Sequence, residues 1–364
     1  MNSTKPLITH QQGFILVGTI WLLAILALAA AVFAKWVEAG IATAQEQHNY
    51  TQGNIDIAST KATLFYLLST QGMSAGGLTV PTPQGTEQKL NISLDNFLSG
   101  APAFQDDMGA ELTQPTGNEL RLDGTAYQGT GSAYFSIVDE SGLLSINTPN
   151  STELYQMLLY LGYDVSKSTD LIDKLLDFKD FDDAHRLNGA ERYHYIQKKL
   201  PPPANSLLLT RFQLSSIIGW KEAKELWETP NLLDNLTTSR KAAININTAS
   251  KEALVIALNL TQSQAEALVE ARENAPFQHL LDAESRSKQK LTDRFDIIRV
   301  LPSATLRIHF WHKGARLDRE VSIELNNVAS RGAPWLIASD ISLKLPTHYV
   351  KTNPVEPQTN LFDQ

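Results

Sequence analysis

Gln11-Gln12-Gly13-Phe14-Ile15-Leu16-Val17 is the stretch that decides the fold, because an uncharged apolar run, Phe14–Ala34, begins inside it. A helix needs about 20 apolar residues to cross the roughly 30 Å hydrocarbon core of a bilayer, so this run is long enough to span it once. The small residues Ala29–Ala31 are followed by further apolar residues rather than by a polar segment, which argues against a secretory signal peptide. The first charge after the run comes only at Lys35. The sequence therefore predicts one membrane anchor that stays attached.

The junction between Gly13 and Phe14 resembles the processing site of type IV pilin-like proteins, in which a dedicated prepilin peptidase cuts after the glycine on the cytoplasmic side. The resemblance implies a leader peptide at residues 1–13, a mature chain that begins at Phe14, and methylation of the Phe14 amine. A plain signal anchor is the alternative that the apolar run leaves open. The flanking charges do not decide the orientation, and the resemblance implies that the N-terminus lies inside.

Gly18 stands where most pilin-like subunits carry a glutamate, five residues into the mature chain. A carboxylate in hydrocarbon is costly unless it is paired, and in a fibre its partner is the terminal amine of a neighbouring subunit. A subunit with no neighbour above it has no use for that carboxylate. Gly18 therefore indicates a subunit at the tip of a fibre, although loss of the glutamate in a divergent pilin would look the same.

The composition excludes several kinds of chemistry. The chain has 364 residues, a formal charge of −8 and no cysteine, and 43% of its residues are hydrophobic, enough for at least one core outside the anchor. The acidic balance argues against non-specific binding of nucleic acid, which depends on cations that neutralise phosphates. Without cysteine there are no disulfides, thiolate metal sites or cysteine nucleophiles. The enzyme motifs HExxH, GxGxxG and the P-loop are absent too, so the sequence predicts that the protein is not an enzyme.

Helical periodicity continues beyond the anchor to about Thr70. A helix that is continuous from Phe14 to that point would be about 85 Å long. Such a long N-terminal helix, partly in lipid and partly under a globular head, is the architecture that pilin-like proteins share.

Two hairpins are predicted after this helix. Tyr134–Val138 and Leu143–Ile146 flank a tetrapeptide rich in turn residues, which predicts the first. The second is predicted by alternation of apolar and polar residues in Leu306–Trp311 and Glu320–Leu325, on either side of Gly314. Between the two hairpins the pattern is almost wholly helical.

The economical prediction is an α+β fold, with a pilin-like long N-terminal helix, a small antiparallel sheet and a large inserted α-helical domain. The predicted segments are the leader peptide (1–13), the transmembrane part of the N-terminal helix (14–34), the first part of the pilin-like domain (35–147), the inserted α-helical domain (148–290), the last strands of the pilin-like domain (291–345) and a disordered tail (346–364). The tail is assigned as disordered because it has three prolines and little apolar content.

Two similar segments lie 100 residues apart in the sequence, and Ile146-Asn147-Thr148-Pro149 corresponds to Ile246-Asn247-Thr248-Ala249. Each copy predicts an extended segment followed by a helix with threonine as its N-cap. Two interpretations stay open, a duplication and a pair of helices that are merely capped alike.

The second copy begins a segment, Ile246–Phe277, that resembles the helix-hairpin-helix of DNA-uptake receptors. A membrane-anchored DNA receptor is therefore the alternative function. DNA-binding versions carry a glycine in the hairpin, so that backbone N–H groups can meet phosphate. Here the hairpin Leu258–Ser263 has no glycine and its surroundings are acidic, which argues against nucleic acid as a partner.

Several acidic residues lie close together in the sequence after position 176. The candidate metal ligands are Asp180, Asp182, Asp183 and Glu191. Ca²⁺ takes six to eight oxygen ligands, and crowded carboxylates of this kind suit it. Asp180, Asp182 and Glu191 fall at the first, third and twelfth places of an EF-hand loop, but Ala184 and His185 occupy the places of a ligand and of the required glycine. The loop is therefore not an EF-hand, and either a calcium site or a solvated acidic loop remains open.

Taken together, these features resemble the minor pseudopilins of the K class from type II secretion systems. The resemblance rests on the junction at Gly13, the missing glutamate at Gly18, the segments Val138–Gly142, Ile146–Asn147 and Ile244–Ala249, and the stretch Asp180–Tyr195. It covers most of the chain from Gly13 to about Leu325, and Phe178 stands where the family usually has tryptophan.

The resemblance implies a structural and assembly subunit at the tip of the pseudopilus, needed for protein export across the outer membrane. The implied partners are minor pseudopilins of the I and J classes, the pseudopilus, the inner-membrane assembly platform and the prepilin peptidase. It also implies Ca²⁺ in the helical domain and a single-pass protein of the inner membrane, with its C-terminal domain in the periplasm.

Overall fold

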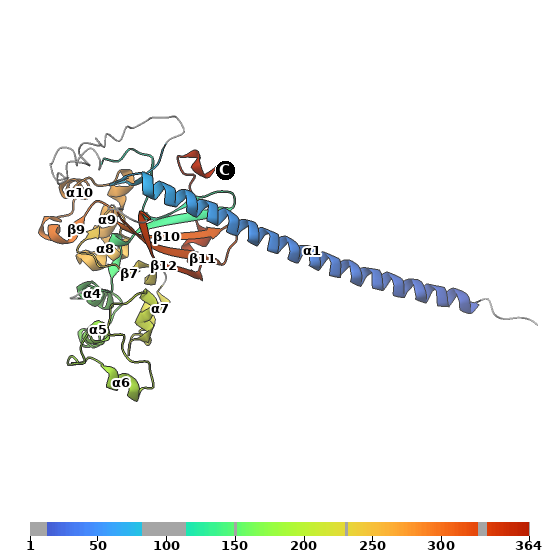
Figure 1. Cartoon of the computed structure of the whole chain (residues 1–364), viewed down its shortest axis with the longest axis horizontal. Coiled ribbons are helices and arrows are strands. Elements are labelled where there is room, and N and C mark those ends of the chain that lie inside the picture. Colours follow the sequence, from blue (N-terminus) through green and yellow to red (C-terminus); the bar gives the residue numbers. More distant parts are fainter. Residues whose placement is uncertain (1–12, 82–113, 149–150, 230–231, 327–332, 364) are drawn as a thin grey trace, which may run out of the picture. The chain divides into compact units, whose positions relative to one another are not determined.

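The computed structural model describes residues 13–81, 114–148, 151–229, 232–326 and 333–363 (Figure 1). The chain forms two units, Met1–Ile55 and Asp56–Gln364. Residues 1–12 of the predicted leader peptide lie outside the described residues.

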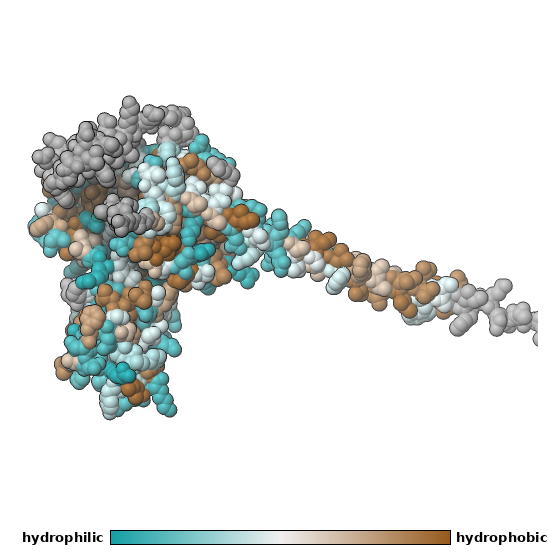
Figure 2. All heavy atoms as spheres, in the orientation of Figure 1, coloured by the Kyte–Doolittle hydropathy of each residue, from teal (hydrophilic) through white to brown (hydrophobic). Residues whose placement is uncertain are grey.

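The first unit consists of the N-terminal part of helix α1 (Gly13–Thr70). Among the described residues, α1 is the one helix that is long and apolar enough to cross a membrane. Its side chains from Leu16 to Phe33 are exposed, and Figure 2 shows them as a hydrophobic band. A surface of this kind is costly in water and stable in lipid, which agrees with the predicted anchor.

The second unit is built on an antiparallel sheet of five strands in the order β12-β11-β10-β5-β4. The strands are β4 (Asp123–Gln128), β5 (Ala133–Asp139), β10 (Thr305–His312), β11 (Leu317–Leu325) and β12 (Trp335–Lys344). A smaller sheet contains β1 (Met73–Ser74), β2 (Gly77–Thr79) and β3 (Glu119–Leu120). In the larger sheet β5 pairs with β10, although a long helical segment separates them in sequence.

The C-terminal turns of α1 pack against this sheet. Leu64, Leu67 and Leu68 recur at helical spacing and are buried in one cluster with Phe135 of β5 and Phe310 of β10. Full burial of side chains of this size contributes about 1.5–3 kcal/mol each. This cluster is the core of the pilin-like part of the chain.

The predicted second hairpin is confirmed. Strands β10 and β11 pair in register, with Ile308 opposite Val321, and Gly314 takes a positive φ of 79° in the turn between them. Glycine adopts this backbone conformation without steric cost, which explains its place between the two alternating runs.

The predicted first hairpin is wrong. After β5 the chain enters a short 3₁₀ helix, η1 (Glu140–Gly142), whose N-terminus is capped by the Asp139 side chain. It then continues into β6 (Leu144–Ser145), which pairs in parallel with β7 (Leu236–Thr237) instead of returning along β5. The turn-forming residues serve as a helix cap, and β5 pairs with β4 and β10.

The inserted segment has a separate hydrophobic core, which contains Trp220, Tyr195 and Phe277. Its helices are α4 (Thr152–Tyr160), α5 (Val165–Lys179), α6 (Arg192–Gln197), α7 (Lys224–Glu228), α8 (Lys251–Leu258), α9 (Gln262–Asn274) and α10 (Leu280–Ser287), with 3₁₀ turns η2 (Arg211–Ser216), η3 (Leu233–Asn235) and η4 (Thr292–Ile297). Strands β8 (Ile244–Asn245) and β9 (Ile298–Arg299) form a parallel pair near its end. Figure 1 shows α6 at the end of this region farthest from the sheet.

The two Ile-Asn-Thr segments occupy equivalent places in two similar halves of the insert. Each follows a short strand with a parallel partner, β6 with β7 and β8 with β9. In the first half the Asn147 amide donates to the carbonyls of Leu208 and Thr238 and accepts from the Leu208 N–H. In the second half the Asn247 amide makes the same three bonds, to the carbonyls of Phe277 and Val300 and from the Phe277 N–H.

A buried cation completes each half. Lys179 donates to the carbonyls of Ile146 and Thr148, and Arg272 donates to those of Ile246 and Ala249. The shared architecture thus extends well beyond the capping of two helices. The threonines predicted as N-caps do not cap, because Ser151 precedes α4 and the Ser250 side chain caps α8.

The prediction of disorder for residues 346–364 is wrong for residues 346–363. Helix α11 (Thr347–Lys351) buries Tyr349, whose hydroxyl lies 2.6 Å from the Ser136 hydroxyl and whose ring stacks on Trp311. A second turn, η5 (Asn360–Phe362), places Phe362 against Phe135 in the sheet core. Two buried aromatic rings therefore hold a segment whose average composition is polar.

Candidate functional site

A buried carboxylate, Asp139, joins the sheet to the insert. Its side chain is fully buried at the end of β5. Among the described residues it accepts hydrogen bonds from six donors, which are the N–H and Oγ of Ser141, Nδ2 of Asn245, Oγ1 of Thr248, and the N–H and Oγ of Ser303. Asn245 and Thr248 belong to the second half of the insert, and Ser303 leads into β10. One carboxylate therefore connects the points at which the chain leaves and re-enters the sheet.

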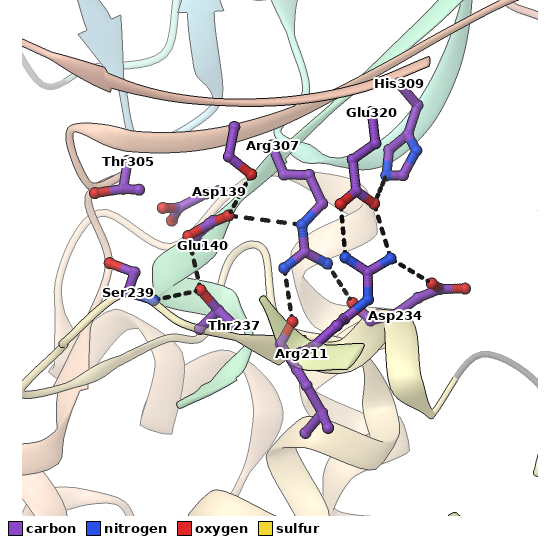
Figure 3. A network of polar contacts seen from close by, with 12 residues as sticks. Asp139, Glu140, Arg211, Asp234, Thr237, Ser239, Thr305, Arg307, His309 and Glu320 are labelled. Carbon is purple, nitrogen blue, oxygen red and sulfur yellow. Dashed lines mark hydrogen bonds and ion pairs between the residues drawn. The ribbon is translucent and has the colours of Figure 1, made fainter. Parts of the chain in front are cut away.

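A network of buried ion pairs continues from this point (Figure 3). The Arg211 guanidinium, from the insert, donates to both carboxylate oxygens of Glu320 on β11 at 2.6 and 2.8 Å. Arg307, which belongs to β10 in the sheet, donates in turn to the carbonyls of Asp234 and Leu236 in the insert. Charged side chains of the insert are thus paired by groups of the sheet, and those of the sheet by groups of the insert. These contacts fix how the insert lies on the sheet.

The electrostatics of Glu320 follow from this pairing. Burial alone would raise the pKa of its carboxyl, but the nearby Arg307 charge and the Arg211 hydrogen bonds outweigh burial and lower the pKa to about 2. An unfolded glutamate titrates near 4.3, so the pair contributes stability above that pH. This contribution is lost as the pH falls toward 2.

The predicted metal ligands lie at and after the C-terminus of α5. Arg186 donates to Asp177 and Asp180 through one nitrogen, at 2.5 and 2.6 Å. Glu191, just before α6, is only 4% exposed, and neither of its carboxylate oxygens has a hydrogen-bond partner in the described part of the chain. The Oδ1 atom of Asp180 is buried without a partner in the same way.

The structure brings some of these carboxylates together and leaves others in solvent. Burial and, to a smaller extent, the negative charges of Asp177, Asp180, Asp183 and Asp182 together raise the pKa of Glu191 to about 7. Asp182 and Asp183 lie on an exposed turn, where Asp182 accepts from the Ala184 N–H. Among the described residues, no three acidic or histidine side chains are close enough together to hold a metal ion.

Asp177 is the member of this group that sequence reasoning missed. It lies one helical turn before Asp180 and its side chain is fully buried. A carboxylate three residues ahead of a candidate ligand on the same helix faces the same side, and that spacing was the available signal.

The predicted cleavage site between Gly13 and Phe14 lies at the first described residues, where the description of α1 begins. The side chains of residues 13–15 lie outside the description, so the structure adds nothing about Phe14 itself. A Cβ atom added at Gly18 would meet no atom within 4 Å, so packing within this chain does not require glycine there.

The predicted helix-hairpin-helix is formed by α8 and α9. Asn259 in its hairpin takes a left-handed conformation with φ of 48°, which lets the chain turn without a glycine. Glu266 on α9 pairs with Lys251 on α8. The motif is therefore present as a packing unit, in a form that lacks the glycine of DNA-binding versions.

A long apolar N-terminal helix, an antiparallel sheet packed on its last turns and an inserted helical region confirm the predicted α+β fold class. Residues 244–297 match the family described as type II secretion system (T2SS), protein K. In this segment the chain is similar to that family, which agrees with the resemblance seen in the sequence.

Among solved structures, one that resembles this chain belongs to the GspK-GspI-GspJ complex of the type 2 secretion system from enterotoxigenic Escherichia coli. The two chains are 14% identical, the alignment covers 82% of this chain and 99% of the other, and the TM-score is 0.47. The search of curated proteins found no match.

The buried pair predicts unequal effects of two arginine substitutions. We expect Arg211→Ala to lower the free energy of unfolding by about 3–5 kcal/mol, because it removes both hydrogen bonds that Arg211 donates to the buried Glu320 carboxylate. Arg319→Ala is the matched control, since Arg319 also pairs with a carboxylate, that of Asp340, but is 53% exposed. Its loss should cost less than about 1 kcal/mol. Urea unfolding of the full chain in detergent measures both, and equal losses would contradict the role assigned to the buried pair.

Proposed function

We propose that this chain is a minor pseudopilin that occupies the tip of the type II secretion pseudopilus and helps to assemble it for protein export across the outer membrane. The observation that carries the proposal is the match of residues 244–297, which lie in the insert, to protein K of that system. The missing glutamate at Gly18 supports the tip position, because a terminal subunit has no neighbouring amine for that carboxylate to reach.

The proposed assembly is electrostatic and directional. After cleavage, the amine of Phe14 receives the glutamate of the subunit below, whereas Gly18 offers no carboxylate to a subunit above. Polymerisation then proceeds on one side of this chain only. The partners in the proposal are minor pseudopilins of the I and J classes, the pseudopilus and the assembly platform. The chain crosses the inner membrane once, with its second unit in the periplasm.

Purification of the full chain from membranes of cells that carry the whole secretion system tests this proposal. Mass spectrometry should find a mature N-terminus at Phe14, with a methylated amine, and should find I-class and J-class pseudopilins in the same sample. In a Gly13→Leu variant, whose junction the peptidase cannot cut, the leader should remain. Recovery of the wild-type chain with its leader intact, or without those partners, would refute the proposal.

We also propose that the acidic turn after α5 binds Ca²⁺ through Asp180, Asp182, Asp183 and Glu191. The buried oxygens of Glu191 and Asp180 that have no hydrogen-bond partner in the described residues support it, because such oxygens are costly unless a cation or a donor reaches them. Arg186 already supplies positive charge to Asp177 and Asp180, but among the described residues no donor reaches Glu191. A calcium ion bound there would neutralise the carboxylates that Arg186 leaves uncompensated.

Calcium should stabilise the chain more strongly at pH 8 than at pH 6, because Glu191 must lose its proton to become a ligand and its pKa is about 7. The measurement is the melting temperature of the full chain with CaCl₂, with EGTA, and with MgCl₂ at equal ionic strength. At a calcium concentration of 100 times Kd the stabilisation would be about 2.7 kcal/mol. Glu191→Gln should abolish most of the shift, while Glu222→Gln at an exposed position should retain it. An unchanged melting temperature in wild type would contradict the site.

A further inference from the structure

A polar cleft of about 450 Å³ lies beside the buried network. One wall is the linker from β7 to β8, which joins the two halves of the insert, and the other is the linker from β9 to β10, which returns to the sheet. Ser239 and Thr305 line the cleft from opposite walls, and both appear at the edge of the network in Figure 3. The cleft is therefore formed at the junction between insert and sheet.

The lining of this cleft is basic although the chain is acidic. Arg240, Lys241 and Arg299 contribute three cations, and Ser141, Ser239 and Ser303 contribute hydroxyl groups. None of the lining residues is acidic. The neighbouring carboxylate of Asp139 is buried and saturated with hydrogen bonds, two of which come from the hydroxyl groups of Ser141 and Ser303. A negatively charged ligand is the kind that this lining favours.

The three cations differ in how many ion pairs and hydrogen bonds each already makes within this chain. Lys241 pairs with Glu153 at 3.1 Å and is almost buried. Arg299 donates to the carbonyls of Leu301 and Pro302 within its own linker, which uses two of the five donors of a guanidinium. Arg240 is exposed and, within the described residues, has no carboxylate partner. Arg240 is thus the cation that remains available for a ligand.

We propose that this cleft binds an acidic peptide segment of a partner protein, with Arg240 pairing a Glu or Asp side chain of that segment and the Ser239 hydroxyl donating to it. The inference builds on the proposed function, because an assembly subunit acts through contacts with other chains. A planar guanidinium binds a carboxylate through two parallel hydrogen bonds, which gives the contact a direction as well as a charge.

The probe is a fluorescent peptide of six glutamates, and its binding to the full chain in neutral detergent is followed by fluorescence anisotropy. We expect binding that weakens as salt is raised, and no binding of a six-glutamine peptide. Arg240→Glu should weaken binding about tenfold or more, because it replaces attraction by repulsion. Arg316→Glu makes the same charge change at an exposed arginine in the β10–β11 turn and should leave binding unchanged.

Equal weakening by the two variants would overturn the proposal, since it would mean attraction to net charge alone. Competition by free glutarate as strong as that by the unlabelled peptide would also overturn it, because the cleft would then take a single carboxylate. The mature N-terminus is measured in the same samples by mass spectrometry. A chain that starts at Phe14 but binds no peptide refutes the cleft alone, whereas a chain that keeps its leader refutes the proposed function.

Discussion

The buried carboxylate of Asp139 is the constraint on which the rest of the second unit depends. A large helical segment can be inserted into a small sheet only if the two ends of the insert return to the same place. Asp139 ends β5, Ser303 precedes β10, and β5 pairs with β10, so the carboxylate holds together the two strands that the insert separates. Its bonds to Asn245 and Thr248 attach the second half of the insert to the same point. Leaving such a group without donors costs about 1–3 kcal/mol or more.

The two halves of the insert share the same arrangement of side-chain contacts. In each half an asparagine side chain replaces backbone pairing beyond a very short parallel strand pair, and a buried cation binds the carbonyls of the turn that follows. Strand pairs of two residues provide few backbone hydrogen bonds, so side-chain amides supply what the ladder lacks. The second half carries the match to the secretion family, while the first half carries the acidic turn. The same scaffold thus supports two different surfaces.

Sequence reasoning succeeded where the signal was local and periodic. The apolar run of α1, the alternation in β10 and β11 and the helical character of the insert each follow from spacing along one element. It failed where the local structure depends on contacts with residues far away in the sequence. The turn after β5 became a helix cap because Asp139 meets partners more than a hundred residues away, and the tail is ordered because Tyr349 and Phe362 reach the sheet. Nor could spacing reveal that Arg211 pairs with Glu320, since nothing local relates them.

Hydrogen exchange of an Asp139→Asn variant tests the central claim most directly. An amide can accept through one atom only and brings donors of its own, so it cannot satisfy the six donors that the carboxylate now accepts. The account predicts faster exchange throughout residues 144–299, with protection retained in the β10–β11 hairpin, and no such change in an Asp340→Asn control at a partly exposed pair. Unchanged protection of the insert in the Asp139 variant would contradict it.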